Sequence, residues 1–128
     1  MAALSTVLHS SFDEALAQTT EALKSEGFGV LTEIDVQSTL KQKLNAEMRR
    51  YRILGACNPP FAHQALQLNP EAGLMMPCNV AVYENTAGDI VVSAVDPQTT
   101  SSAFGDPKLE QLGAEVREKL ARVIAKLV

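Results

Sequence analysis

Apolar residues recur along the chain with two spacings, which predict alternating strands and helices. Residues 4–8 and 29–34 are rich in β-branched and large apolar side chains, which is typical of short strands. Between them, apolar residues three and four positions apart predict a helix that begins after Ser11 and ends before Gly27. Ser11 and Glu14 have the spacing of a capping box, in which the serine oxygen accepts a hydrogen bond from the Glu14 amide.

A second helix and a third strand follow in the middle of the chain. Asp35 can cap a short helix, because its carboxylate can accept a hydrogen bond from an amide of the first turn. At four-residue steps, Val36, Leu40 and Leu44 are expected to face inward from this helix. Residues 51–57 then predict the third strand.

Prolines mark the boundaries of the next elements. Asn58 and Pro59 predict a helix start, with the amide as N-cap and the proline at a position that needs no N–H group. This helix is expected to end before Pro70. Residues 77–84 and 89–95 predict two strands joined as a hairpin by a glycine-containing turn.

The last quarter of the chain predicts a loop and a long helix. Residues 98–105 are mostly threonine, serine and other polar or small residues, and we expect a loop there. Asp106 and Pro107 repeat the pattern of a cap followed by proline. The helix after them has a sustained apolar stripe, made of Leu109, Leu112, Val116, Leu120, Val123, Ile124 and Leu127.

The resulting order, β-α-β-α-β-α-β-β-α, predicts the α+β class. We expect a two-layer sandwich, in which a mixed five-stranded sheet carries helices packed mainly on one face. There is no internal repeat or linker, so residues 1–128 are expected to form a single domain.

The composition argues against a nucleic-acid partner and against a membrane-spanning helix. The net charge is −4, and nucleic-acid binding needs a concentrated basic surface, so we expect no nucleic-acid partner. The longest uncharged run, residues 53–70, contains three prolines and does not predict a membrane helix. Residues 1–23 contain no lysine or arginine, so they do not resemble a secretory signal. We therefore expect a small soluble cytoplasmic protein whose thiols are free.

Two Cys-Asn dipeptides lie in a window, residues 53–83, whose only charged residue is Glu71. Cys57 is expected at the end of a strand, just before a helix start, where amides and the helix dipole stabilise a thiolate. The alternative is a small cysteine buried beneath the turn. Cys78 taken alone predicts a core residue, and its spacing of 21 residues from Cys57 is not that of a C-x-x-C site.

Whether the two cysteines meet depends on the strand direction. If the strands over residues 51–57 and 77–84 are parallel, Cys57 and Cys78 lie at opposite ends and share no site. If the strands are antiparallel, the two positions converge. The sequence leaves both arrangements open.

Three further polar residues have two interpretations each. Asn79 lies within a predicted strand, where its amide either bonds a loop backbone or lines a pocket. Glu33 is either a solvent-facing strand residue or a general base or metal-supporting carboxylate. His63 is either a hydrogen-bonded residue of the helix surface or a nitrogen ligand.

Residues 27–36, 51–59 and 77–80 together resemble the bacterial and archaeal family filed as domain of unknown function 302. The specific parts are Gly-Ala-Cys-Asn-Pro, at residues 55–59, and Pro-Cys-Asn, at residues 77–79. The resemblance implies a compact α+β unit and is consistent with a homodimer, but it implies no activity. It also implies that the family pattern includes a set of five residues, which are the candidate ligand-binding residues, namely Glu33, Cys57, Asn58, Cys78 and Asn79.

Three functions are compatible with these residues. The first is a homodimeric binding module whose pocket, near Cys57, Asn58 and Glu33, holds a small ligand or a soft metal. Copper or zinc could then be bound by Cys57, Cys78 and His63. The second is a structural or interaction domain that forms a homodimer. The third is a thiol-dependent enzyme, with Cys57 as nucleophile and Glu33 or His63 as base.

Overall fold

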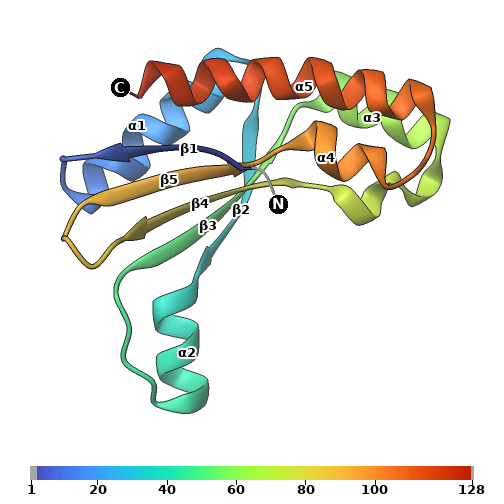
Figure 1. Ribbon diagram of the computed structural model, residues 1–128. Coiled ribbons are helices and arrows are strands. Elements are labelled where there is room, and N and C mark those ends of the chain that lie inside the picture. Colours follow the sequence, from blue (N-terminus) through green and yellow to red (C-terminus); the bar gives the residue numbers. More distant parts are fainter. Residues whose placement is uncertain (1–2, 128) are drawn as a thin grey trace.

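In the computed structural model, which describes residues 3–127, strands and helices follow the predicted order with two short additions, η1 and α4 (Figure 1). The elements are β1 (Ala3–Leu8), α1 (Phe12–Ser25), β2 (Gly29–Asp35), α2 (Val36–Leu44), β3 (Tyr51–Cys57), α3 (Pro59–Leu68), the 3-10 helix η1 (Pro70–Met75), β4 (Cys78–Glu84), β5 (Ile90–Val95), α4 (Pro97–Ser102) and α5 (Pro107–Lys126). None of the described helices is long and apolar enough to cross a membrane.

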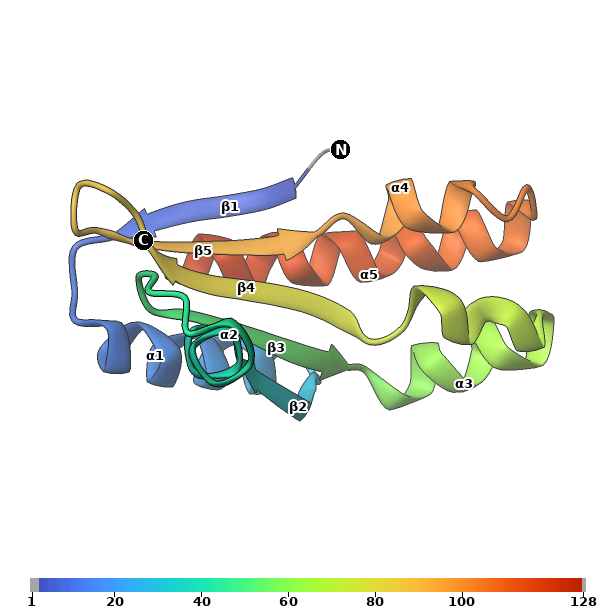
Figure 2. The same ribbon diagram turned by 90° about the horizontal axis from the view of Figure 1, so that it is seen from below.

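The strands form one open sheet in the order β1-β5-β4-β3-β2. The α+β class is confirmed, but the expected mixed sheet is wrong, because all four pairings of the described strands are antiparallel. A parallel pair would need a connection that crosses back over the sheet. Helix α3 instead extends beyond the end of the sheet, so that β4 starts where β3 finishes (Figure 2). Helix α2 likewise leaves the sheet between β2 and β3.

Helices α1 and α5 cover one face of the sheet, and the core lies between them and the strands (Figure 1). The serine half of the predicted capping box is confirmed, since the Glu14 amide donates to Ser11 Oγ over 3.1 Å. Much of the predicted stripe of α5 is buried. The largest fully buried side chains include Leu23, Leu54, Leu109, Leu120 and Val82.

Helix α2 departs from the prediction that its apolar residues face inward. Its cap is as expected, because the Ser38 amide donates to Asp35 Oδ1 over 2.9 Å. However, none of the nine residues of α2, all of them described, is buried, and Leu44 is 72% exposed. The reason is that α2 begins directly after Asp35, the last residue of the edge strand β2. With no linker to reverse the chain, the helix continues away from the sheet (Figure 1).

The predicted loop over residues 98–105 is also wrong, because its first half forms α4. Asp96 caps this helix by accepting from the Gln98 amide over 2.9 Å, and its other carboxylate oxygen lies 3.1 Å from Arg117 Nε. Gly113 of α5 allows close approach, since a Cβ atom there would lie 2.7 Å from the Pro97 carbonyl oxygen. Packing against α5 thus stabilises a helix whose own residues favour a loop.

Candidate functional site

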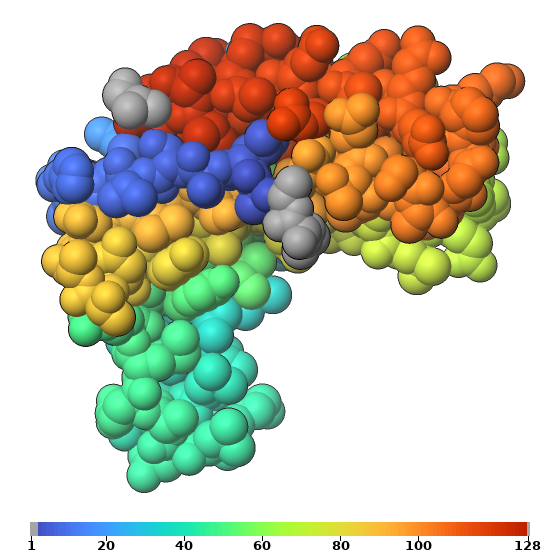
Figure 3. All heavy atoms as spheres, in the orientation of Figure 1, coloured from blue at the N-terminus to red at the C-terminus, as the bar shows by residue number. Residues whose placement is uncertain are grey.

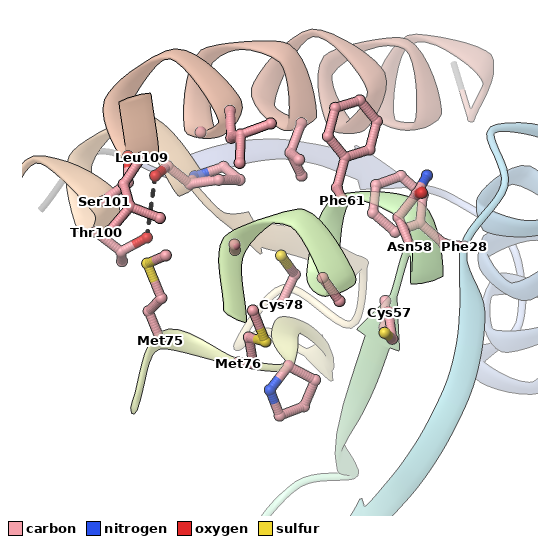
Figure 4. A pocket seen from close by; sticks show the side chains of 18 residues that line it. Phe28, Cys57, Asn58, Phe61, Met75, Met76, Cys78, Thr100, Ser101 and Leu109 are labelled. Carbon is pink, nitrogen blue, oxygen red and sulfur yellow. Dashed lines mark hydrogen bonds between the residues drawn. The ribbon is translucent and has the colours of Figure 1, made fainter. Parts of the chain in front are cut away.

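The antiparallel pairing brings the two cysteine positions to the same end of the sheet. Cys78 pairs with Ala56, and Cys57 pairs with Gly29 on the other side of β3. Because side chains alternate along a strand, the two sulfur atoms point to opposite sides of the sheet (Figure 4). Cys78 points toward the helices, whereas Cys57 points away from them, and both thiols are free.

A cavity of about 70 Å³ lies next to Cys78, where the end of the sheet meets α3, η1, α4 and α5 (Figure 4). Its walls are mainly aromatic, aliphatic and sulfur-containing. They include Phe28, Ala56, Cys57, Asn58, Phe61, Ala65, Met75, Met76, Cys78, Leu109, Leu112 and Val116. Helix α4 closes one side with Pro97, Thr100 and Ser101.

The few polar groups in the walls are bonded to nearby backbone. Thr100 Oγ1 donates to the Pro97 carbonyl over 3.2 Å, and Ser101 Oγ donates to the Gln98 carbonyl over 3.2 Å. Burial, with a smaller contribution from the neighbouring Cys57 thiol, raises the pKa of Cys78 to about 11. Cys78 is therefore a neutral thiol at pH 7, and the cavity suits an uncharged ligand.

Asn58 does not act as the expected helix cap. Within residues 3–127, its side chain makes no cap bond; its Nδ2 group donates to the Glu26 carbonyl oxygen over 3.2 Å. The reason is that Pro59 and Pro60 occupy the first two helical positions. The second of these prolines removes one of the two amides to which a cap side chain can bind. Asn58 instead links the start of α3 to the α1–β2 turn.

The described cavity walls do not include Glu33, Asn79 or His63. Glu33 pairs with Leu54 further along the sheet, and its carboxylate lies 3.4 Å from Arg52 Nη1. Asn79 is exposed opposite Gly55, and His63 is exposed on α3. Among residues 3–127 there is no group of three or more His, Cys, Asp or Glu residues that could hold a metal ion.

Most of the cavity walls could not be predicted from the sequence. Phe61, Met75 and Met76 lie within the uncharged window, which was the only local signal for them. Leu109 and Ser101 come from the last quarter of the chain. The sequence predicted Leu109 as part of a helix stripe and Ser101 as part of a loop. Neither pattern indicated that these residues meet residues of α3.

An ion cluster joins the end of α1 to α5 next to Asn58. The Glu26 carboxylate lies 2.7 Å from Lys126 Nζ and 2.8 Å from Arg122 Nε, and its side chain is only 11% exposed. Hydrogen bonds from Lys126, and then from Arg122, lower the pKa of Glu26 to about 2. The cluster therefore holds the turn that accepts the Asn58 hydrogen bond.

We expect this cluster to make the free energy of unfolding depend on pH. A carboxylate with a lowered pKa stabilises the fold above its unfolded value, near 4.5, and this contribution is lost as the pH falls from 4.5 toward 2. Urea unfolding at a series of pH values should show that the free energy of unfolding falls less over this window in Glu26→Gln than in the wild-type protein. Glu21→Gln is the control, because that carboxylate is 77% exposed and 3.9 Å from Lys24. If the free energy of unfolding of Glu26→Gln depended on pH as steeply as that of the wild-type protein, the prediction would be contradicted.

Comparisons with known proteins agree with this fold. The family model described as domain of unknown function DUF302 matches residues 4–127. A solved structure titled as an uncharacterized conserved protein DUF302 from Bacillus stearothermophilus is 27% identical in sequence. The two structures superpose with a TM-score of 0.93, over 100% of this chain and 99% of that chain. A comparison with curated proteins gives no match.

Proposed function

The chain belongs to the family described as domain of unknown function DUF302, and from this premise we propose that it is a binding module whose cavity beside Cys57 and Asn58 holds a small uncharged ligand. The observation that carries the proposal is the apolar cavity between the end of the sheet and α3, η1, α4 and α5. Pockets of this kind, with few polar groups, are the usual sites for small molecules.

The size of the cavity limits the ligand. An apolar cavity of ~150 Å³ can bind benzene or xenon, and the volume here is about 70 Å³. A ligand smaller than benzene fits without any change in the walls. Met75 and Met76 form part of the wall, and methionine side chains adapt to different shapes. Their movement would admit a somewhat larger molecule.

A small molecule is better supported than copper or zinc. A zinc site needs at least three protein ligands, and Cys57, Cys78 and His63 do not form such a group among the described residues. The Cys78 thiol is also kept protonated by burial, whereas the thiolate is the metal-binding form. No cofactor is part of the proposal.

A thiol-dependent enzyme is the least supported function. Such chemistry needs a base within hydrogen-bonding reach of the thiol. Glu33 lies beside Arg52, and His63 is on the exposed side of α3, so neither belongs to the described walls of the cavity.

Xenon is a suitable probe of this proposal because it is apolar and small. Under xenon pressure, NMR methyl signals of Met75, Met76 and Leu109 should shift, while that of the exposed Leu74 should not. Ala65→Leu fills the cavity from α3 and should abolish the shifts, whereas Ala17→Leu on the exposed side of α1 should preserve them. If the cavity methyls of the wild-type protein do not respond to xenon, the proposed binding site is refuted.

The second candidate is an interaction domain that forms a cytoplasmic homodimer, and it is compatible with the first. The open face of the sheet, opposite α1 and α5, favours it (Figure 2). A nucleic-acid partner is not supported. Arg49, Arg50 and Arg52, the densest basic cluster, lie 3.0–3.4 Å from carboxylates of Glu84, Asp13 and other residues.

A further inference from the structure

No helix among residues 3–127 lies flat on the face of the sheet opposite α1 and α5, and α2 projects from this face end-on (Figure 2). The strand pairings place Val7, Val91, Tyr83 and Tyr51 in one row across this face. The rings of Tyr51 and Tyr83 are stacked, with centroids 5.1 Å apart. Val7, at the edge, is 44% exposed. An apolar row of this kind is usually packed against another layer.

The next row of the same face is also uncharged. It contains Ser5, Ser93, Ala81 and Ile53, and continues on β2 with Ile34, which is 48% exposed. Within the described residues, every paired position on this face is apolar, hydroxyl-bearing, amide or glycine. Solvent-facing sheets normally carry charged side chains, so this composition is typical of the centre of a protein interface.

Helix α2 projects beyond the same face as an arm, so the molecule has an L-shaped outline with a hollow between arm and sheet (Figure 3). Val36, Leu40 and Leu44 follow one another at four-residue steps along the arm. Leu44, at the end of the arm, is 72% exposed. An amphipathic helix that projects from its own domain gains stability by packing on another surface.

The open face and the arm together approach the area that a dimer needs. Five strands spaced ~4.8 Å apart and six residues long give a flat area of roughly 480 Å². A nine-residue helix adds a strip of roughly 130 Å². A stable interface buries ~800 Å² of accessible surface per partner, and side-chain relief makes accessible surface larger than flat area. The flat area of the sheet is little more than half of this figure, and the arm raises the flat area to roughly three quarters of it, so side-chain relief has to supply only the remaining quarter.

We infer that a second copy of this chain covers the open face, with the arm α2 of each subunit lying in the hollow of the other. A two-fold arrangement pairs the same surface with itself, and the uncharged sheet face can do so without like-charge repulsion. The arm carries Lys41 and Lys43, and Lys41 is paired with the carboxylate of Glu47. This inference rests on the homodimer proposed above and identifies its interface. The tyrosine pair and Ser93 become buried at the contact.

Sedimentation at micromolar concentration tests the interface. The wild-type chain should sediment as a dimer, and Ser93→Arg should weaken dimerisation at least about 100-fold, because it buries an unpaired charge from each subunit. Ala17→Arg is the control, since Ala17 is exposed on α1, on the opposite side of the sheet from the open face, and this variant should remain dimeric (Figure 1). Circular dichroism shows whether each variant is folded.

A second measurement needs no substitution. The chain has no tryptophan and two tyrosines, both on the open face, so its intrinsic emission reports on that face. Acrylamide should quench the emission more strongly on dilution, as the dimer dissociates. A wild-type monomer would refute both the homodimer and this interface. A dimer that persists in Ser93→Arg, or that dissociates without a change in quenching, would refute the interface but leave the homodimer.

Discussion

Replacing Gly113 by alanine is expected to destabilise the domain by about 1–3 kcal/mol, the cost of inserting atoms into a closely packed contact. A Cβ atom at this position would lie 2.7 Å from the Pro97 carbonyl oxygen and 2.9 Å from Ser101 Cβ. The first of these is a backbone atom, and Ser101 is fully buried, so neither can move aside without shifting α4. The free energy of unfolding, measured in urea, gives the size of the effect.

The Gly113→Ala variant also tests whether α4 shapes the cavity. Pro97, Thr100 and Ser101 line the cavity from α4, so a displaced α4 should change its response to xenon. Gly73→Ala is the matched control, because a Cβ atom there would have no neighbour within 4 Å among the described residues. Equal stability of the two variants would show that α4 and α5 are not closely packed in solution.

Replacing Leu109 by alanine should destabilise the domain by about 2–5 kcal/mol, because it removes a fully buried leucine and leaves a void. Leu109 is 0% exposed and forms a second core cluster with Ala65 and Ala72, which joins α5 to α3 and η1. It also lines the cavity, so the void adds to the space of about 70 Å³. Urea unfolding measures the loss, with Leu74→Ala as the exposed control.

Benzene should then restore part of the stability lost in Leu109→Ala, since a ligand that binds only the folded state raises the unfolding free energy. The enlarged cavity approaches the size of apolar cavities that accept benzene. The wild-type protein should respond less, because its cavity is smaller. A thermal melt of Leu109→Ala that is unaffected by benzene would mean that the walls collapse into the void.

Several local features were predicted correctly because they depend on neighbours in the chain. The helix caps at Ser11, Asp35 and Asp106 each use a side chain that accepts a hydrogen bond from an amide two or three residues away. The stripe of α5 was recognisable because helical spacing places Leu109, Val116 and Leu120 on one side. These features need no knowledge of the rest of the fold.

The site was predicted only in part. Cys57 and Asn58 were placed correctly at the junction of a strand and a helix. The role of Asn58 was wrong, because its partner is the carbonyl oxygen of Glu26, far away in the sequence. Glu33, Asn79 and His63 were linked to the cysteines by family resemblance or residue type, and the fold places them elsewhere.

The sequence by itself determined the α+β class, the order of most elements and their boundaries, because caps, prolines and apolar spacing act over a few residues. Only the tertiary structure decided the antiparallel pairing of the strands, the helix over residues 97–102, the projecting arm and the cavity. Each of these depends on contacts between distant segments, such as Gly113 with Ser101 or Ala56 with Cys78. Because such contacts are long-range, no local pattern encodes them.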